Sequence, residues 1–120
     1  MTAEEHTLLG KIVISPNAIA TVASHAALQS YGVVGMAAKN VMDGLTNIVT
    51  RDPRHGVDVA FHAEGVIIHV YVIVEYGTRV STVASSLASA VRFNVEKTLG
   101  VNVREVNVHV QGLRISSPDV

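Results

Sequence analysis

The chain has 120 residues, nine of them basic and ten acidic, and it contains no cysteine. Charged residues make up only 16% of it, against about 25% in ordinary soluble domains. No basic stripe is visible, so nucleic-acid binding is not expected, and the absence of cysteine excludes disulfides and thiolate sites. We expect a single domain over residues 1–120, with polar tails at about 1–7 and 116–120, whose low charge favours self-association.

No segment of the sequence has the length and polarity of a membrane span. The longest apolar run, Val66 to Val74, is interrupted by His69 and is too short to cross a bilayer. The acidic, polar start lacks the basic and apolar regions of a signal peptide. We therefore expect a cytoplasmic location and no direct membrane insertion.

The first predicted elements are a short strand at residues 10–14 and a helix that follows it. Ser15 and Pro16 are typical of an N-cap and a first helical position. An apolar stripe then recurs at helical spacing, and Gly32 is expected to end the helix. Residues 33–36 predict a short strand, while residues 39–56 fit a helical turn or a surface loop, and both remain open.

Two strands joined by a tight turn give the clearest pattern in the chain. Apolar residues alternate over residues 57–61 and again over residues 66–74. A turn at residues 62–65 would place Phe61 opposite Val66 and Val59 opposite Ile68, with every apolar side chain on one face.

A second helix is predicted from Arg79 to Leu99, ended by Gly100, and a final strand runs through Val106 and Val110. The order of elements is that of a split β-α-β unit. The predicted fold class is α+β: a two-layer β-α-β-β-α-β arrangement with two helices on one face of a mostly antiparallel sheet.

The other face of the long strand is not cleanly polar. It carries Ile67, His69, Tyr71 and Ile73. An antiparallel sheet facing water normally shows polar side chains there, so these residues are candidates for an interaction surface. The alternative is the ordinary preference of β-branched and aromatic residues for strands.

Three histidines fall on the same parity as this face. They are His62, His69 and His109, which are weak candidates for a zinc site with three imidazoles and a water. Solvated strand histidines explain the same pattern, and no metal is predicted. No nucleophile elbow, paired carboxylates or phosphate-binding loop is present, so we expect no catalytic residue, no cofactor and no enzymatic activity.

Three segments together carry a resemblance to a known family. They are Gly10–Pro16 followed by Tyr31–Met36, then Val70–Gly77, then Val106–Gly112. They resemble the G-K-I-x-I-s, G-v-x-G-m, v-v-x-Y-G and V-N-V-x-V-Q-G-v signatures of the alkaline-shock-protein family, in matching order and spacing over about residues 8–115. The length is similar to a small single-domain subgroup that is linked with dihydroxyacetone-kinase-like proteins.

The resemblance implies a cytoplasmic protein of bacterial cell-envelope homeostasis and stress response, with no established catalytic residue. It also implies self-assembly and a protein partner, either a small membrane-anchored protein or a kinase-like protein. The leading hypothesis is a non-enzymatic, self-associating adaptor that can be held at the membrane by its partner. The alternative is a small-molecule or lipid-binding module with an apolar pocket.

Overall fold

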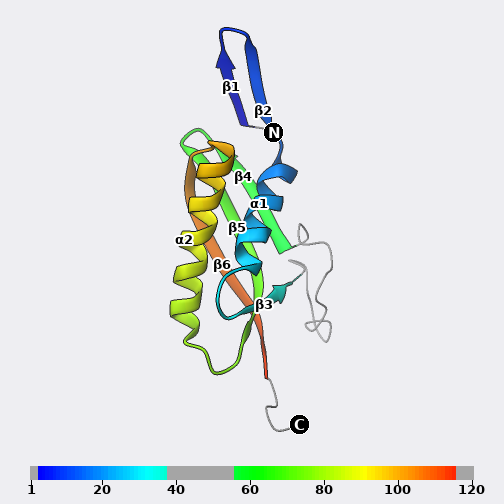
Figure 1. The fold of residues 1–120 in the computed structure, drawn as a ribbon, viewed down its shortest axis with the longest axis vertical. Coiled ribbons are helices and arrows are strands. Elements are labelled where there is room, and N and C mark those ends of the chain that lie inside the picture. Colours follow the sequence, from blue (N-terminus) through cyan, green and yellow to red (C-terminus); the bar gives the residue numbers. More distant parts are fainter. Residues whose placement is uncertain (1–2, 38–55, 116–120) are drawn as a thin grey trace.

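The computed structural model describes residues 3–37 and 56–115. Their elements are β1 (Ala3–Thr7), β2 (Gly10–Ile14), α1 (Pro16–Leu28), β3 (Val33–Met36), β4 (Val57–His62), β5 (Gly65–Glu75), α2 (Val80–Leu99) and β6 (Val103–Arg114) (Figure 1). The α+β class and the predicted order of strands and helices are confirmed. Of the segment at residues 39–56, all but Gly56 lies outside the described residues.

β5 is the central strand of the main sheet. β6 pairs with it in parallel from Val66 to Glu75, and β4 pairs antiparallel with residues 65–70. β3 pairs antiparallel with residues 72–74. Because β6 occupies one edge of β5 along almost its whole length, β4 and β3 share the other edge, one after the other. The parallel β5–β6 pair follows from the crossover through α2.

The hairpin of β4 and β5 has the predicted register. Phe61 lies opposite Val66, Val59 opposite Ile68, and Val57 opposite Val70. The parity of the apolar residues determines this register, because a slip by one residue would move every one of these side chains to the other face.

The N-terminal segment differs from the prediction. Residues 1–7 were expected to be a polar tail, yet Ala3–Thr7 forms β1 and pairs antiparallel with β2. These two strands make a separate two-stranded sheet that extends beyond the end of the main sheet (Figure 1). The predicted first strand therefore does not join the main sheet. The other predicted tail, residues 116–120, lies outside the described part of the chain.

The helix ends follow local chemistry, with two differences from expectation. The Ser15 hydroxyl accepts a hydrogen bond from the Ala18 amide at 3.2 Å, as an N-cap does. α1 ends at Leu28 rather than at Gly32, whose φ of +87° instead serves the turn into β3. α2 begins at Val80, so that Arg79 is its N-cap residue rather than its first helical residue, and it is ended by Gly100 in the left-handed conformation.

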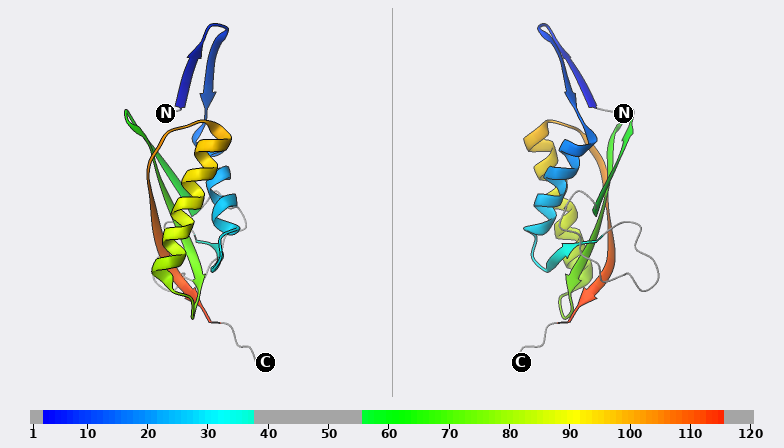
Figure 2. Two further views of the ribbon diagram at one scale, coloured as in Figure 1. Left: turned by 60° about the vertical axis from the view of Figure 1, so that its left-hand side comes forward. Right: turned by 90° about the vertical axis from the view of Figure 1, so that its right-hand side faces the viewer.

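Both helices lie on the same face of the sheet (Figure 2). The core between the two layers is almost entirely aliphatic. Its fully buried members are Ile19, Ala23, Ala27, Ile68, Val70, Val72, Leu87, Val91 and Val95. With so many small side chains, the two helices can approach each other and the sheet closely.

Candidate functional site

The candidate site is the sheet face turned away from the helices, which we call the second face. Within residues 3–37 and 56–115 no helix lies over it (Figure 2). Ile67, His69 and Tyr71 of β5 are half-buried there, together with His109 of β6. Ile73 has the same parity but is only 7% exposed, so it offers little area to a partner. The surface that remains is Ile67, His69, Tyr71 and His109.

His69 and His109 are in direct contact on this face. The His69 Nδ1 and His109 Nε2 atoms lie 3.0 Å apart, which is a hydrogen-bond distance. One ring must carry the proton and donate it while the other accepts, so the contact fixes a pair of complementary tautomers. The register places His69 opposite Asn107 and Tyr71 opposite His109, so the two histidines meet diagonally across the parallel strands.

Tyr71 completes the cluster by stacking on His109. The ring centroids are 4.4 Å apart and the planes differ by 11°. His69 and His109 have ring centroids 5.2 Å apart, at 34°. The three rings hold one another in place. A rigid group of amphipathic rings loses little side-chain freedom on binding, which suits it to contact with another protein.

His62 does not join this cluster. It is exposed and lies opposite Gly65, whereas Asp58 is the residue of β4 opposite His69. Four residues of strand separate the two positions, which is roughly 13 Å. No group of three or more His, Cys, Asp or Glu residues able to hold a metal occurs among the described residues. The three-histidine zinc site therefore remains a hypothesis that this geometry does not favour.

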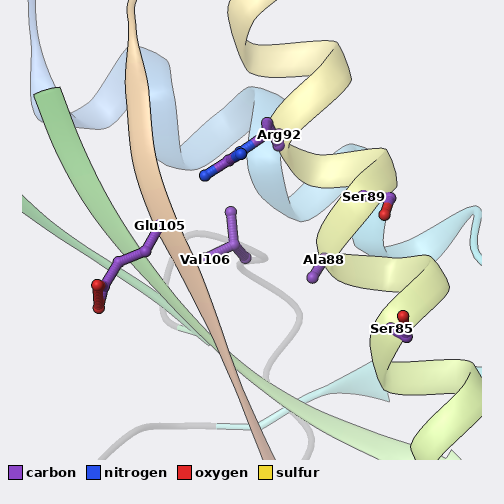
Figure 3. A pocket seen from close by; sticks show the side chains of 6 residues that line it. All are labelled: Ser85, Ala88, Ser89, Arg92, Glu105 and Val106. Carbon is purple, nitrogen blue, oxygen red and sulfur yellow. The ribbon is translucent and has the colours of Figure 1, made fainter.

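A groove that sequence reasoning missed lies between α2 and β6. It has a volume of about 330 Å³ and is lined by Ser85, Ala88, Ser89, Arg92, Glu105 and Val106 (Figure 3). The Arg92 guanidinium donates a hydrogen bond to the Arg104 carbonyl oxygen at 2.6 Å. The four residues of α2, Ser85, Ala88, Ser89 and Arg92, have the spacing i, i+3, i+4 and i+7. This spacing in the sequence could have predicted that they share one face of the helix.

Other polar residues are placed as ordinary structural groups. His25 lies exposed on α1. The buried polar residue of that helix is Ser24, whose hydroxyl donates to the Thr21 carbonyl at 3.1 Å. Neither of the helices described is long and apolar enough to cross a membrane.

A comparison with models of known protein families shows to which family the chain belongs. The model of the alkaline shock protein 23 family, which is described by a "cell envelope-related function", matches residues 4–115. The chain belongs to this family. The resemblance to alkaline-shock proteins that the sequence motifs carry is thereby confirmed. The family description names a cell envelope-related function and no reaction.

Relatives of this alkaline-shock-family protein match it along almost their full length. The uncharacterised protein YloU of Bacillus subtilis (strain 168) is 43% identical over 120 residues, which cover 98% of this chain and 100% of YloU. The uncharacterised protein Spy1614 of Streptococcus pyogenes serotype M6 is 34% identical over 117 residues, covering 96% and 97% of the two chains.

Solved structures give a more distant likeness. The structure named "MamM CTD D249N - Zinc form" has a TM-score of 0.48 and 13% identity, covering 83% of this chain and 85% of that one. The structure named "MamM CTD H264E" has a TM-score of 0.47. Nothing about metal binding or assembly in the alkaline-shock-family chain follows from a similarity at this level.

Proposed function

We propose that this alkaline-shock-family protein is a non-enzymatic, self-associating adaptor that serves cell-envelope homeostasis and the stress response through its surfaces. The family description supports the cell-envelope setting. The adaptor role, the self-association and the partner, whether a membrane-anchored small protein or a kinase-like protein, are part of the proposal, as is a cytoplasmic location.

The observation that carries the proposal is the ordered ring cluster on the second face. Three rings from two strands are fixed by a 3.0 Å hydrogen bond and a 4.4 Å stack, although the core needs none of them. Half-buried apolar and aromatic groups at the centre of a surface, with polar groups around them, are typical of protein contacts. Asn107 and Asp58, which flank His69 on its two neighbouring strands, supply such polar groups.

A photo-crosslinking experiment in the native cell tests the adaptor role. A photoreactive residue in place of Ile67 reports on the second face, and one in place of Phe93, which is 60% exposed on α2, is the matched control. We expect a discrete crosslinked protein from position 67 and none from position 93. Equal crosslinking from both positions, or none from position 67, would contradict the adaptor proposal.

The self-association is tested separately on the purified chain. Sedimentation velocity at several concentrations should show an average mass that rises with concentration. A constant monomer mass would remove self-association from the proposal and leave the adaptor role to the crosslinking result.

The groove between α2 and β6 supports a second candidate, a small-molecule-binding module. Its volume of about 330 Å³ falls at the lower end of ligand pockets. Two serines and Arg92 line it beside Ala88 and Val106, so it suits a small polar ligand better than a lipid chain. The Glu105 carboxylate points away from the groove and accepts a hydrogen bond from the Asn107 amide at 3.1 Å (Figure 3). Native mass spectrometry of protein purified from its own cells should then show a bound ligand that is lost in Arg92→Ala. A wild-type mass equal to the bare chain would reject this candidate.

A further inference from the structure

Exposed large apolar side chains gather at two opposite ends of the molecule. Of the eleven among the described residues, only Phe93 lies in the middle of an element away from both ends. Four belong to the hairpin of β1 and β2: Leu8, Leu9, Ile12 and Val13. The other six lie towards the end where α1 and β5 finish, which we call the far end: Leu28, Tyr31, Tyr76, Val110, Leu113 and Ile115. Single exposed apolar side chains are ordinary on a protein surface, whereas exposed apolar side chains that gather in patches indicate a binding partner.

The hairpin stands apart from the rest of the protein. Among the described residues, β1 pairs only with β2, in a sheet of their own, and the two strands extend away from the helices and the main sheet (Figure 1). Leu8 and Leu9 form its tip and are 105% and 101% exposed, as much as in an unfolded chain. An isolated two-stranded hairpin is at best marginally stable in water. A partner that covers the two leucines would stabilise the hairpin as well as the contact.

The far end offers a pocket of matching size and character. A pocket of about 120 Å³, partly open to solvent, lies where the turn after α1 meets the start of α2, and it is lined by Tyr31, Arg79, Thr82, Val83 and Ser86. An apolar cavity of roughly 150 Å³ admits a group as large as benzene, so this pocket has room for the end of one leucine side chain. The Glu75 amide donates to the Gly32 carbonyl, and the Tyr76 amide donates to that of Arg114, which fixes this end of the sheet beside the pocket.

The charges of the two ends are also complementary. The hairpin segment, residues 3–14, carries Glu4 and Glu5 against Lys11 alone, so it is net acidic. Arg79 at the pocket is exposed and has no ion-pair partner in the part of the chain that the structure describes. An acidic arm and a basic pocket attract one another and set the direction of approach.

We propose that the Leu8–Leu9 tip of one copy docks into the Tyr31–Arg79–Val83 pocket of a second copy, head to tail. The inference rests on the proposed self-association and names the contact that produces it. A contact between two different surfaces leaves a free tip on one copy and a free pocket on the other. It therefore builds rings or open chains rather than closed two-fold dimers.

Two variants that each remove one half of the contact test the proposal. Leu8→Ser with Leu9→Ser removes the apolar tip, and no core residue depends on it. Thr82→Glu places a carboxylate at the pocket, in the first turn of α2, where an acidic side chain suits the helix dipole. Circular dichroism and the melting temperature check that each variant is folded. Phe93→Ser is the matched control, because it removes an exposed ring away from both ends.

Sedimentation velocity of the full chain measures the outcome. We expect the apparent association constant to fall at least tenfold in the tip variant and in the pocket variant, and to stay unchanged in Phe93→Ser. An equimolar mixture of the two defective variants should form a heterodimer, because one keeps the pocket and the other keeps the tip. Two-fold contacts between hairpins would instead leave the pocket variant fully associated.

The outcomes separate this inference from the function on which it rests. A wild-type protein that stays monomeric rejects both the self-association and the tip-to-pocket contact. A wild-type protein that associates while the tip variant associates equally well rejects only this inference. Loss of association in the tip variant without complementation by the pocket variant rejects the pocket as the acceptor.

Discussion

His69 of β5 contacts His109 of β6 at 3.0 Å, although the strand register places His69 opposite Asn107. The contact is diagonal, so it depends on the stagger of the two parallel strands as well as on their being neighbours. A shift of β6 by one residue would turn His109 to the other face and replace it with a valine. The contact between His69 and His109 therefore forms only when β5 and β6 are paired in this register.

Replacement of His109 by alanine should destabilise the fold moderately. It removes one side-chain hydrogen bond, about 1 kcal/mol, and one stacked ring pair, about 0.5–1.5 kcal/mol. We expect the free energy of unfolding in urea to fall by about 1.5–2.5 kcal/mol. His62→Ala is the control, because His62 is exposed outside the cluster, and a surface change of this kind stays within about 0.5 kcal/mol. Equal effects of the two substitutions would contradict the cluster's role.

Gly32→Ala should be more damaging than Gly100→Ala. Both glycines have positive φ, +87° and +71°, so an alanine is strained at either position. At Gly32 the new Cβ would also lie 2.8 Å from Val83 Cγ2, whereas at Gly100 nothing lies within 4 Å. Thermal unfolding should show a loss of about 1 kcal/mol at Gly100 and roughly twice that at Gly32. The reverse order would argue against close packing of this turn on α2.

Ser15→Ala should destabilise the start of α1. The Ser15 hydroxyl accepts from the Ala18 amide, and loss of such a cap costs about 1 kcal/mol. Urea denaturation should show this loss with an unchanged slope. Ser85→Ala is the matched control within α2, where alanine has the higher helix propensity, so stability should be kept or slightly raised. An unchanged free energy of unfolding in Ser15→Ala would mean that water satisfies the Ala18 amide in place of the Ser15 hydroxyl.

Zinc should not be retained through the three strand histidines. Only His69 and His109 are in contact, and His62 lies at the other end of the β4–β5 ladder. Two imidazoles supply half of the ligands of a closed zinc site. Native mass spectrometry after zinc loading and dialysis should therefore give the mass of the bare chain. Retained zinc that disappears in His62→Ala would show that the three residues do meet in solution.

Much of the main sheet was predictable because its residues alternate strictly. The β4–β5 register followed from the parity of Val59 and Phe61, since only one alignment turns both side chains toward the core. The same register also places His62 far from His69, a consequence that could have been drawn from the sequence. The predicted last strand is shorter than β6. The register of the β5–β6 pair shifts after Val66 and again after Val72 of β5, so the alternation of apolar residues in β6 is broken near both of its ends.

Two features depended on information that local patterns do not carry. Ala3–Thr7 is a polar segment that pairs only with β2 in the part of the chain that the structure describes, and its sequence shows no apolar face that would mark it as a strand. The contact of His69 with His109 depends on the stagger between two strands that a 20-residue helix separates in the chain. Parity could bring both histidines to one face, but not to within hydrogen-bond distance.

The parallel pairing of β5 with β6 has a consequence for synthesis. β5 is the most buried strand, yet one of its edges stays open until α2 and β6 have both left the ribosome. During that interval its backbone groups from Val66 to Glu75 offer a template to any passing strand. The nascent chain therefore cannot pair the open edge of β5 until α2 and β6 have been synthesised. Slow translation through α2 and β6 should favour aggregation over folding.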